Sequence, residues 1–227
     1  MNKIISMALV LFILAGCSKE DSDGREPPVV GSVDLGLSVD WAECNLGAEN
    51  AWDYGNYYAW GETTPKSGYT WNSYVFWISG SLSDVKLRKY VTSNAYGNID
   101  GLVRLDSDDD VARKSLGKGW RMPTDVELAE LRDNCDWTLT TLNGVRGYQV
   151  KSRKSDASIF LPAAGDMIGN TLDHEGRECR YWSSKVHFTM CTNAMALVSE
   201  NHLSNVIPIT GLARYVGCPV RPVYDYR

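Results

Sequence analysis

Residues 123–135 read Pro-Thr-Asp-Val-Glu-Leu-Ala-Glu-Leu-Arg-Asp-Asn-Cys (PTDVELAELRDNC), and this stretch carries the sharpest local structural signal in the chain. Thr124 with Glu127 three residues later has the capping-box pattern of a helix N-terminus. Apolar residues then recur at positions i, i+3 and i+7, which places them on one face of a three-turn helix: Leu128, Leu131 and Cys135. The stretch therefore predicts a short helix that buries this face in a core.

A second short helix is expected upstream of this stretch. The acidic triplet Asp108–Asp110 leads into Val111–Leu116, and acidic side chains are favourable at the positive N-terminal end of a helix. We also considered a calcium loop beginning at Asp106. The EF-hand pattern needs Gly at its sixth position and Glu at its twelfth, and these positions hold Val111 and Gly117. The acidic residues are therefore assigned to a helix start.

The remainder of the domain has the pattern of short β-strands. Val33–Asn45 is expected to form a hairpin, Asn56–Glu62 an aromatic strand, and residues 63–104 loops with short strands. After Gly147 six further strands are expected: Tyr148–Ser152, Ser158–Leu161, Arg180–Ser184, Ala194–Ser199, Val206–Ile209 and Cys218–Val223. Two helices among many short, turn-bounded strands predict an α+β fold with mostly antiparallel sheet.

The N-terminus has the pattern of a lipoprotein signal peptide over residues 1–16. The apolar run Ile4–Leu14 spans about 16 Å as a helix, roughly half the thickness of a bilayer core, so it fits a signal peptide better than a membrane span. Leu14–Cys17 (LAGC) resembles a bacterial lipobox, in which the chain is cut before the cysteine and Cys17 is lipidated. The alternative is an ordinary signal peptide with a chance cysteine at its cleavage site. The lipid on Cys17 makes the membrane an expected partner.

Residues 17–32 are expected to be a solvated tether in front of a single domain over residues 33–227. Ser18–Pro28 is polar and acidic, and an acidic stretch after the lipidated cysteine resembles the surface-export signal of Bacteroides-type lipoproteins. We therefore expect a protein anchored in the outer membrane and facing the cell exterior. A merely hydrophilic linker, with the domain on the periplasmic face, is the alternative. The net charge of −5 argues against a nucleic-acid partner.

The sequence contains no recognisable catalytic or cofactor-binding motif, so no enzyme activity, cofactor or metal is expected. Five cysteines follow Cys17, none in a C-x-x-C pair, and this spacing does not suit a zinc site. Cys44 and Cys135 stand in apolar, aromatic surroundings and are expected to be small core residues. A disulfide between Cys179 and either Cys191 or Cys218 remains open at this stage.

Several segments in order carry a resemblance to a known family, and they span residues 33–223. They are Val33–Val39 with Trp41-Ala42, Asn45–Ala48, Tyr58–Thr63, Gly119–Thr124, Phe160–Gly165, Tyr181–Ser184 and Val220–Val223. Together these segments resemble the Fibrobacter succinogenes major paralogous domain family of surface lipoproteins. That resemblance implies a C-type-lectin-like fold related to formylglycine-generating, sulfatase-modifying enzymes. Four tryptophans fall within these segments and are expected to pack the framework: Trp41, Trp60, Trp120 and Trp182.

The resemblance implies two different functions. Catalysis in the enzyme branch depends on a close pair of late cysteines that binds copper, whereas the late cysteines here are widely separated, which argues against this activity. In the binding branch, residues 185–217 would form a display segment for a ligand, so an adhesin-type module that binds an extracellular protein or glycan is the expected function. The candidate ligand-binding residues are His187, Phe188, Thr189, His202, Asn205, Ile207, Ile209 and Tyr215.

One feature of the display segment suggests a more specific alternative. Residues 201–216 (NHLSNVIPITGLARYV) contain no Lys, Glu, Gln, Met or Trp. Adenine-directed mutation of Asn codons reaches every residue type except these five, so this composition is what a diversity-generating retroelement would leave. A short β-rich stretch can lack these residues by chance. The alternative is therefore a target protein of such an element, with a hypervariable binding surface.

Overall fold

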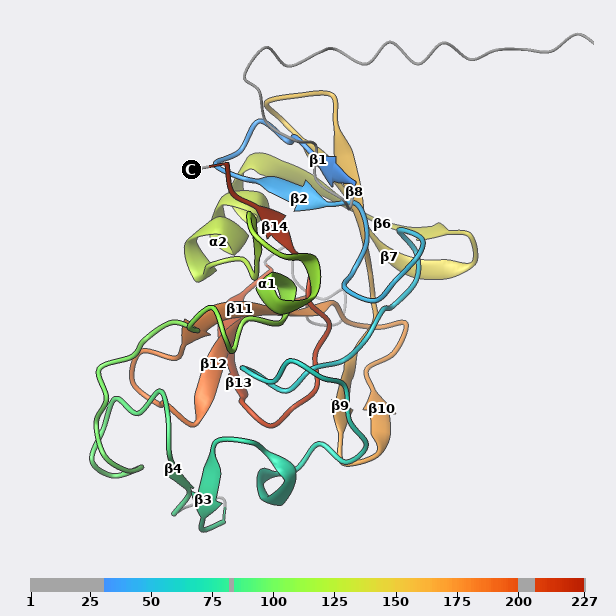
Figure 1. The fold of residues 1–227 in the computed structure, drawn as a ribbon. Coiled ribbons are helices and arrows are strands. Elements are labelled where there is room, and N and C mark those ends of the chain that lie inside the picture. Colours follow the sequence, from blue (N-terminus) through green and yellow to red (C-terminus); the bar gives the residue numbers. More distant parts are fainter. Residues whose placement is uncertain (1–30, 82–83, 200–206, 227) are drawn as a thin grey trace, which may run out of the picture.

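The computed structural model describes residues 31–81, 84–199 and 207–226, and it has an α+β architecture of short antiparallel strands with two α-helices (Figure 1). One sheet joins both ends of the described chain in the order β1-β2-β14-β5. Its strands are β1 (Ser32–Val33), β2 (Asp40–Ala42), β5 (Trp120–Arg121) and β14 (Val223–Tyr224). The predicted α+β class is thus confirmed, and so is the hairpin expected over 33–45.

Two three-stranded sheets contain the longer strands of the domain. The first has the order β6-β7-β8, with β6 (Cys135–Leu142), β7 (Val145–Ser152) and β8 (Ser158–Pro162). The second has the order β11-β12-β13, with β11 (Arg180–Val186), β12 (Asn193–Val198) and β13 (Ile209–Ala213). Smaller hairpins pair β3 (Trp77–Ser79) with β4 (Lys86–Leu87) and β9 (Asp166–Ile168) with β10 (Thr171–Asp173). A short 3-10 helix, η1 (Trp71–Ser73), precedes β3.

Both predicted helices form with the expected caps. In α2 (Asp125–Asn134) the Thr124 hydroxyl accepts a hydrogen bond from the Glu127 amide, and the Glu127 carboxylate accepts one from the Thr124 amide. Leu128, Leu131 and Cys135 are buried, as predicted. The other helix, α1 (Val111–Leu116), is capped by Asp110 and ends at Gly117. Gly117 has φ +86°, a conformation that favours glycine. No helix of the described chain is long and apolar enough to cross a membrane.

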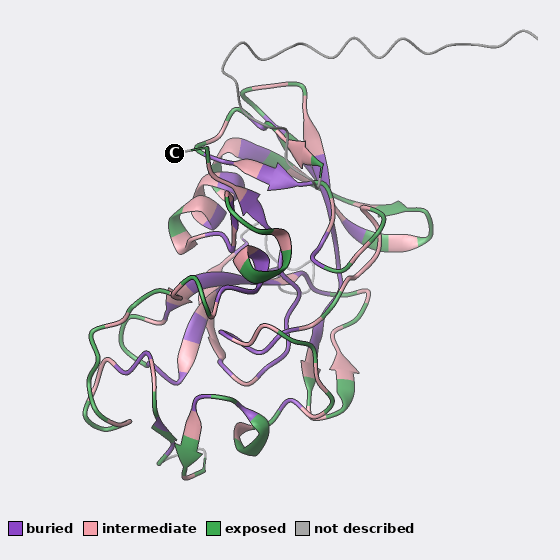
Figure 2. Ribbon diagram, in the orientation of Figure 1, coloured by how far each residue is buried: buried purple, intermediate pink, exposed green. Residues whose placement is uncertain are grey.

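The β11-β12-β13 sheet separates two hydrophobic clusters. Tyr181 and Leu197 pack into one cluster together with α2, β7 and β8, whereas Trp182 and Ala196 pack into the other, beneath residues 56–105. Successive side chains of these strands point to opposite faces of the sheet, so the same strands contribute residues to both clusters. The four framework tryptophans are almost fully buried, which confirms the prediction that they pack the core. In Figure 2 the buried positions are concentrated along these central strands.

Three strand predictions are wrong, entirely or in their bounds. Residues 56–62 form no strand, and Tyr58 makes only an isolated bridge to Cys218. In the predicted strand Cys218–Val223, only Val223 belongs to a strand, because Pro219 and Pro222 have no amide to donate to a ladder. The backbone there bonds instead to several segments in turn, at Tyr58, Leu46, Ala42 and Trp182. The strand expected at Val206–Ile209 begins only at Ile209, and the long strand β6 was not predicted.

Candidate functional site

The connection between β11 and β12 forms an exposed tip at residues 187–190, within the predicted display segment. The His187 amide donates to the Asn193 carbonyl (2.9 Å), and the His187 Nδ1 accepts from the Met190 amide (3.2 Å). Phe188 is 74% exposed, and its ring stacks on the His187 ring with centroids 4.5 Å apart. Met190 is 45% exposed. The tip thus presents an aromatic and an apolar side chain to solvent on a hydrogen-bonded turn.

The structure places the other candidate ligand residues differently. Thr189 is exposed beside Phe188, so three of the eight candidates lie together in the tip. Ile207 is only 7% exposed and packs into the cluster around α2, with Ile209 partly buried against the same cluster. Ile207 is therefore a core residue in this structure and not a surface contact. His202 and Asn205 lie outside the described residues, as does Cys17.

Tyr215 lies in a half-buried aromatic pair. Its ring meets the ring of Trp71 edge-on, with centroids 5.0 Å apart, and Trp71 in turn meets Tyr74 at 5.8 Å. Tyr215 thereby joins the end of the display segment to the loop region before β3. Its packing role does not exclude contact with a ligand, because part of the side chain remains accessible.

Beneath this pair lies Arg214, a fully buried arginine that was not identified from the sequence. Its Cζ lies 4.8 Å from the ring centroid of Trp60, and it is within 5.3–5.6 Å of the rings of Tyr74, Phe76 and Tyr90. Its guanidinium donates to the Tyr74 hydroxyl and to three backbone carbonyl oxygens, those of Lys89, Tyr90 and Cys191. No carboxylate of the described residues forms an ion pair with it. The aromatic cage and the carbonyl dipoles together satisfy this cation.

The Cys191 carbonyl is the link between Arg214 and the tip, because Cys191 directly follows Met190. The Arg214 amide also donates to the Thr192 carbonyl (3.0 Å). One arginine thus ties the base of the tip to residues 89–90 of the long loop region. A buried charge in the display segment gives no local sequence signal, because arginines are mostly exposed.

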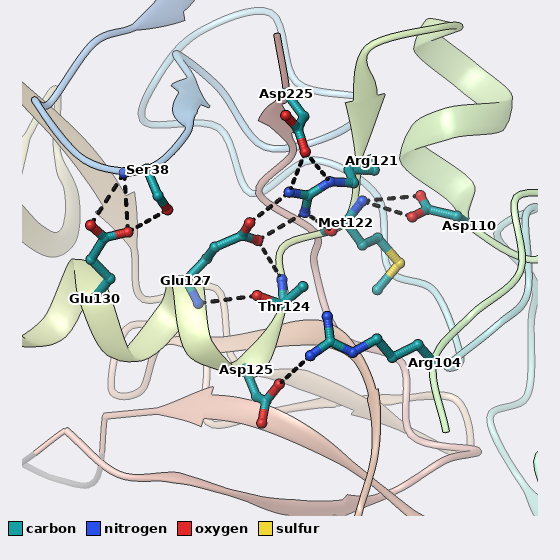
Figure 3. A network of polar contacts seen from close by, with 10 residues as sticks. All are labelled: Ser38, Arg104, Asp110, Arg121, Met122, Thr124, Asp125, Glu127, Glu130 and Asp225. Carbon is teal, nitrogen blue, oxygen red and sulfur yellow. Dashed lines mark hydrogen bonds and ion pairs between the residues drawn. The ribbon is translucent and has the colours of Figure 1, made fainter. Parts of the chain in front are cut away.

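A cavity of about 510 Å³ lies at the start of α2, and its polar network is shown in Figure 3. Arg121 donates to both oxygens of Glu127 (2.6 and 2.8 Å) and to Asp225 (2.9 Å). Hydrogen bonding to Glu127 raises the pKa of Arg121. Burial alone would raise the pKa of Glu127, but hydrogen bonds from Arg121 and the Thr124 amide outweigh it, so the pKa is lowered. These groups satisfy one another and hold α2 against β5 and β14.

A second group of charged side chains lies around Asp125, the first residue of α2. Asp125 lies 3.8 Å from Arg104 and 3.6 Å from Lys185, the residue just before Val186 at the end of β11. Asp110 accepts hydrogen bonds from the Arg113 and Met122 amides, while its burial raises its pKa. The acidic residue at the helix start therefore has a structural role. This observation agrees with the assignment made from the sequence.

A second cavity, of about 570 Å³, lies between the loop 43–51, β1 and the β6-β7-β8 sheet. Its lining includes the carboxylates of Glu43 and Glu49 and the thiol of Cys44. Cys44 is only partly buried, so the prediction that it is a small core residue is wrong, whereas the same prediction for Cys135 is confirmed. A smaller cavity of about 310 Å³ lies on the other side of the same loop.

The cysteines form no disulfide among the described residues, and neither open pairing of Cys179 occurs. Burial raises the pKa of Cys179 to about 12 and that of Cys135 to about 11, and it raises the pKa of Cys218 well above its ordinary value. These thiols therefore stay protonated at neutral pH and are poor nucleophiles and metal ligands. Within the described ranges no group of three or more His, Cys, Asp or Glu side chains is placed to hold a metal ion.

One further titratable cluster supports the β9–β10 hairpin. Asp166 is fully buried, lies 2.6 Å from the His174 Nδ1 and accepts a hydrogen bond from Arg180 at 3.0 Å. Arg180 also bonds Glu178 at 2.9 Å. No hydroxyl or thiol hydrogen-bonds to His174 in the described structure, so the geometry of a nucleophile and its base is not present there. The cluster therefore stabilises the hairpin.

Comparisons with known proteins add no relative to this picture: no family model matches the chain, and neither a curated protein nor a solved structure is significantly similar to it.

Proposed function

We propose that this chain is a lipid-anchored protein of the bacterial outer surface, with a C-type-lectin-like domain that binds an extracellular protein ligand. The binding surface is centred on the tip, residues 187–190. Cys17 carries the lipid, and residues 17–32 form the tether to the domain. The domain acts by binding and not by catalysis, which agrees with the protonated, buried state of the late cysteines Cys179 and Cys218.

The exposure of Phe188 is the observation that carries the proposal. A phenylalanine that is 74% exposed forgoes most of its hydrophobic burial, about 1.5–3 kcal/mol for a side chain of this type. Its stacking on His187 and the hydrogen bonds of the turn restrict its motion, so little entropy is lost when a partner covers it. Aromatic anchors of this kind dominate the binding energy of many protein interfaces.

The surroundings of the tip favour a protein ligand over a small sugar. The tip contains no charged residue, and the exposed Met190 and Val103 extend its apolar character. Val103 lies beside the end of β11, where its carbonyl accepts from the Val186 amide. The three cavities described above are lined by other residues. A protruding apolar surface fits a complementary groove on another protein.

The test uses residues 18–227 without the lipid, which include every residue that the structure describes. This protein is applied to arrays of extracellular protein domains and of glycans. We expect a protein ligand whose affinity falls about tenfold or more with Phe188→Ala, while the melting temperature is unchanged. Val126→Ala, which truncates an exposed apolar residue on α2, is the matched control and should bind normally. Binding to glycans alone, or binding unaffected by Phe188→Ala, would contradict the proposal.

A second candidate function is a diversified ligand-binding protein, favoured by the composition of residues 201–216. In the structure Ile207, Arg214 and Val216 are buried, so variation at these positions would disturb the core. A diversified surface would therefore be confined to the exposed positions of the segment. Sequencing of the surrounding DNA tests this: the hypothesis requires a near-copy of the codons for 182–223, differing at adenines, beside a reverse transcriptase gene.

A further inference from the structure

The edge of the β6-β7-β8 sheet is exposed along β6. Among the described residues this eight-residue strand pairs with β7 alone, and the two strands project from the body of the domain as a hairpin (Figure 1). The hairpin turns through Asn143 and Gly144, which both have positive φ (48° and 83°), as a two-residue type I′ turn requires. The tip of the hairpin is among the exposed parts of the chain in Figure 2.

The hydrogen-bond pattern shows which backbone groups of β6 point outward. The Arg146 carbonyl accepts from the Ala163 amide, and the Ser152 amide donates to the Ala157 carbonyl, so these β7 residues face the β8 side. The β6 residues that lie opposite Arg146 and Ser152 therefore form no backbone hydrogen bonds with them. With this alternation, the amides and carbonyls that point away from β7 belong to Cys135, Trp137, Leu139 and Thr141. The Cys135 carbonyl accepts a hydrogen bond from the Arg153 guanidinium at 2.9 Å. In the described structure the groups of the other three residues have no backbone partner.

The side chains of β6 do not protect this edge. Residues 137–142 (WTLTTL) contain no charged residue, proline or glycine, and Leu139 and Leu142 are 37% and 38% exposed. Proteins usually guard a long edge strand with lysine, proline, a bulge or a covering segment, because its free backbone groups pair readily with another strand. The ladder of β6 with β7 is regular, without a bulge. These features indicate that another strand covers β6.

We propose that β6 pairs antiparallel with β6 of a second copy of this chain, about a two-fold axis at Leu139. The Cys135 end of the edge is already bonded by Arg153, and the three remaining outward-pointing residues lie symmetrically about Leu139, so this part of the strand can pair with its own copy. In this register Leu139 faces Leu139 of the second copy, and Trp137 faces Thr141 in both directions. The three pairs would each exchange two backbone hydrogen bonds.

The side chains also fit this register. On one face of the joined sheet Leu139 packs against Leu139 of the second copy. On the other face Thr138 lies opposite Thr140, so apolar side chains contact apolar ones and hydroxyl groups contact hydroxyl groups. Asp136, the one charged residue of β6, lies opposite Leu142 and meets no like charge. The pairing joins two three-stranded sheets into one six-stranded sheet and is isologous, as in most homodimers. A foreign peptide would need an unrelated complementary sequence, whereas the second copy supplies one.

The first test removes one outward-pointing donor. In Thr141→Pro the lost amide is not used within the hairpin, and proline is tolerated on an edge strand when its nitrogen faces solvent. Sedimentation of residues 18–227 should show a concentration-dependent dimer for the wild type and a monomer for Thr141→Pro. Thr141→Val, which keeps the amide, is the matched control and should remain dimeric. A monomeric wild type at every concentration, or a dimer unaffected by Thr141→Pro, would overturn the proposal.

The second test locates the axis and does not depend on how Thr141→Pro folds. Leu139→Lys or Leu139→Glu alone would place two like charges about 5 Å apart across the axis, so each variant should be monomeric. A 1:1 mixture of the two variants should form a heterodimer, because opposite charges then meet. A mixture that stays monomeric refutes the register at Leu139, and open-ended aggregates of the wild type refute the closed two-fold pairing.

Discussion

Replacement of Arg214 by methionine should destabilise the domain strongly, although it removes a buried charge that has no acidic partner. Methionine fills similar volume but leaves the carbonyls of Lys89, Tyr90 and Cys191 without their donor. Each of these three buried acceptors costs about 1–3 kcal/mol without a partner, and loss of the contacts with the aromatic rings adds about 1–2 kcal/mol, about 4–11 kcal/mol together. Relief of the desolvated cation offsets part of this sum. We therefore expect the free energy of unfolding to fall by about 3–5 kcal/mol.

The assay is urea unfolding of residues 18–227, followed by tryptophan fluorescence and circular dichroism. A change of this size corresponds to a melting temperature lower by about 10 °C for a domain of this length. Arg146→Met, at an exposed position of β7, is the matched control and should change stability by less than about 0.5 kcal/mol. Arg214→Lys keeps the charge but loses the planar fork of donors, so it should also be destabilised. If Arg214→Met stays within about 1 kcal/mol of the wild type, the cage does not support the fold as argued.

Two further predictions concern single titratable groups. Because the pKa of Glu127 is lowered in the folded state, its contribution is present above its ordinary value of 4.5 and is lost as the pH falls through the lowered pKa. In urea unfolding, Glu127→Gln should therefore cost about 1–2 kcal/mol at pH 7. This cost should shrink as the pH falls below 4.5, and a cost that does not change with pH would contradict the ion pair with Arg121. Among the five cysteines after Cys17, only Cys44 is partly accessible, so a thiol reagent should label one cysteine per native chain of residues 18–227 and all five after denaturation. Labelling of only three after denaturation would reveal a disulfide.

The parts of the fold that could be predicted are those with local causes. The capping box at Thr124 and the acidic start at Asp110 each satisfy amides within three residues, so both helices were found with their N-termini. The burial of Trp182 and the other framework tryptophans likewise followed from their segments. Strand β6 was missed because it begins at Cys135, directly after the last residue of α2, with no turn residue between them.

The parts that could not be predicted depend on contacts between distant segments. Residues 56–62 have the composition of a strand, but their backbone bonds to Cys218 and Arg214, which belong to no neighbouring strand at those points. Phe188 was predicted to be a ligand contact of the display segment, and in the structure it is exposed in the turn that connects two predicted strands. Ile207 was assigned to the same surface and is buried, since nothing in its local sequence distinguishes a ligand contact from a residue that packs on α2.

The same long-range contacts explain how a chain with so little regular structure can hold the tip, residues 187–190, in place. The described residues of 63–104, which exclude 82–83, contain a 3-10 helix and two short strands, and a region with so little regular structure would ordinarily be mobile. Here the Arg214 guanidinium donates hydrogen bonds both to residues 89–90 and to the base of the tip, which holds the two segments together. Aromatic side chains of the region surround this guanidinium. Trp60, Tyr74 and Tyr90 therefore have a structural role, since their rings stabilise the cation. Phe188 lies outside this cage, which leaves its ring available to a ligand.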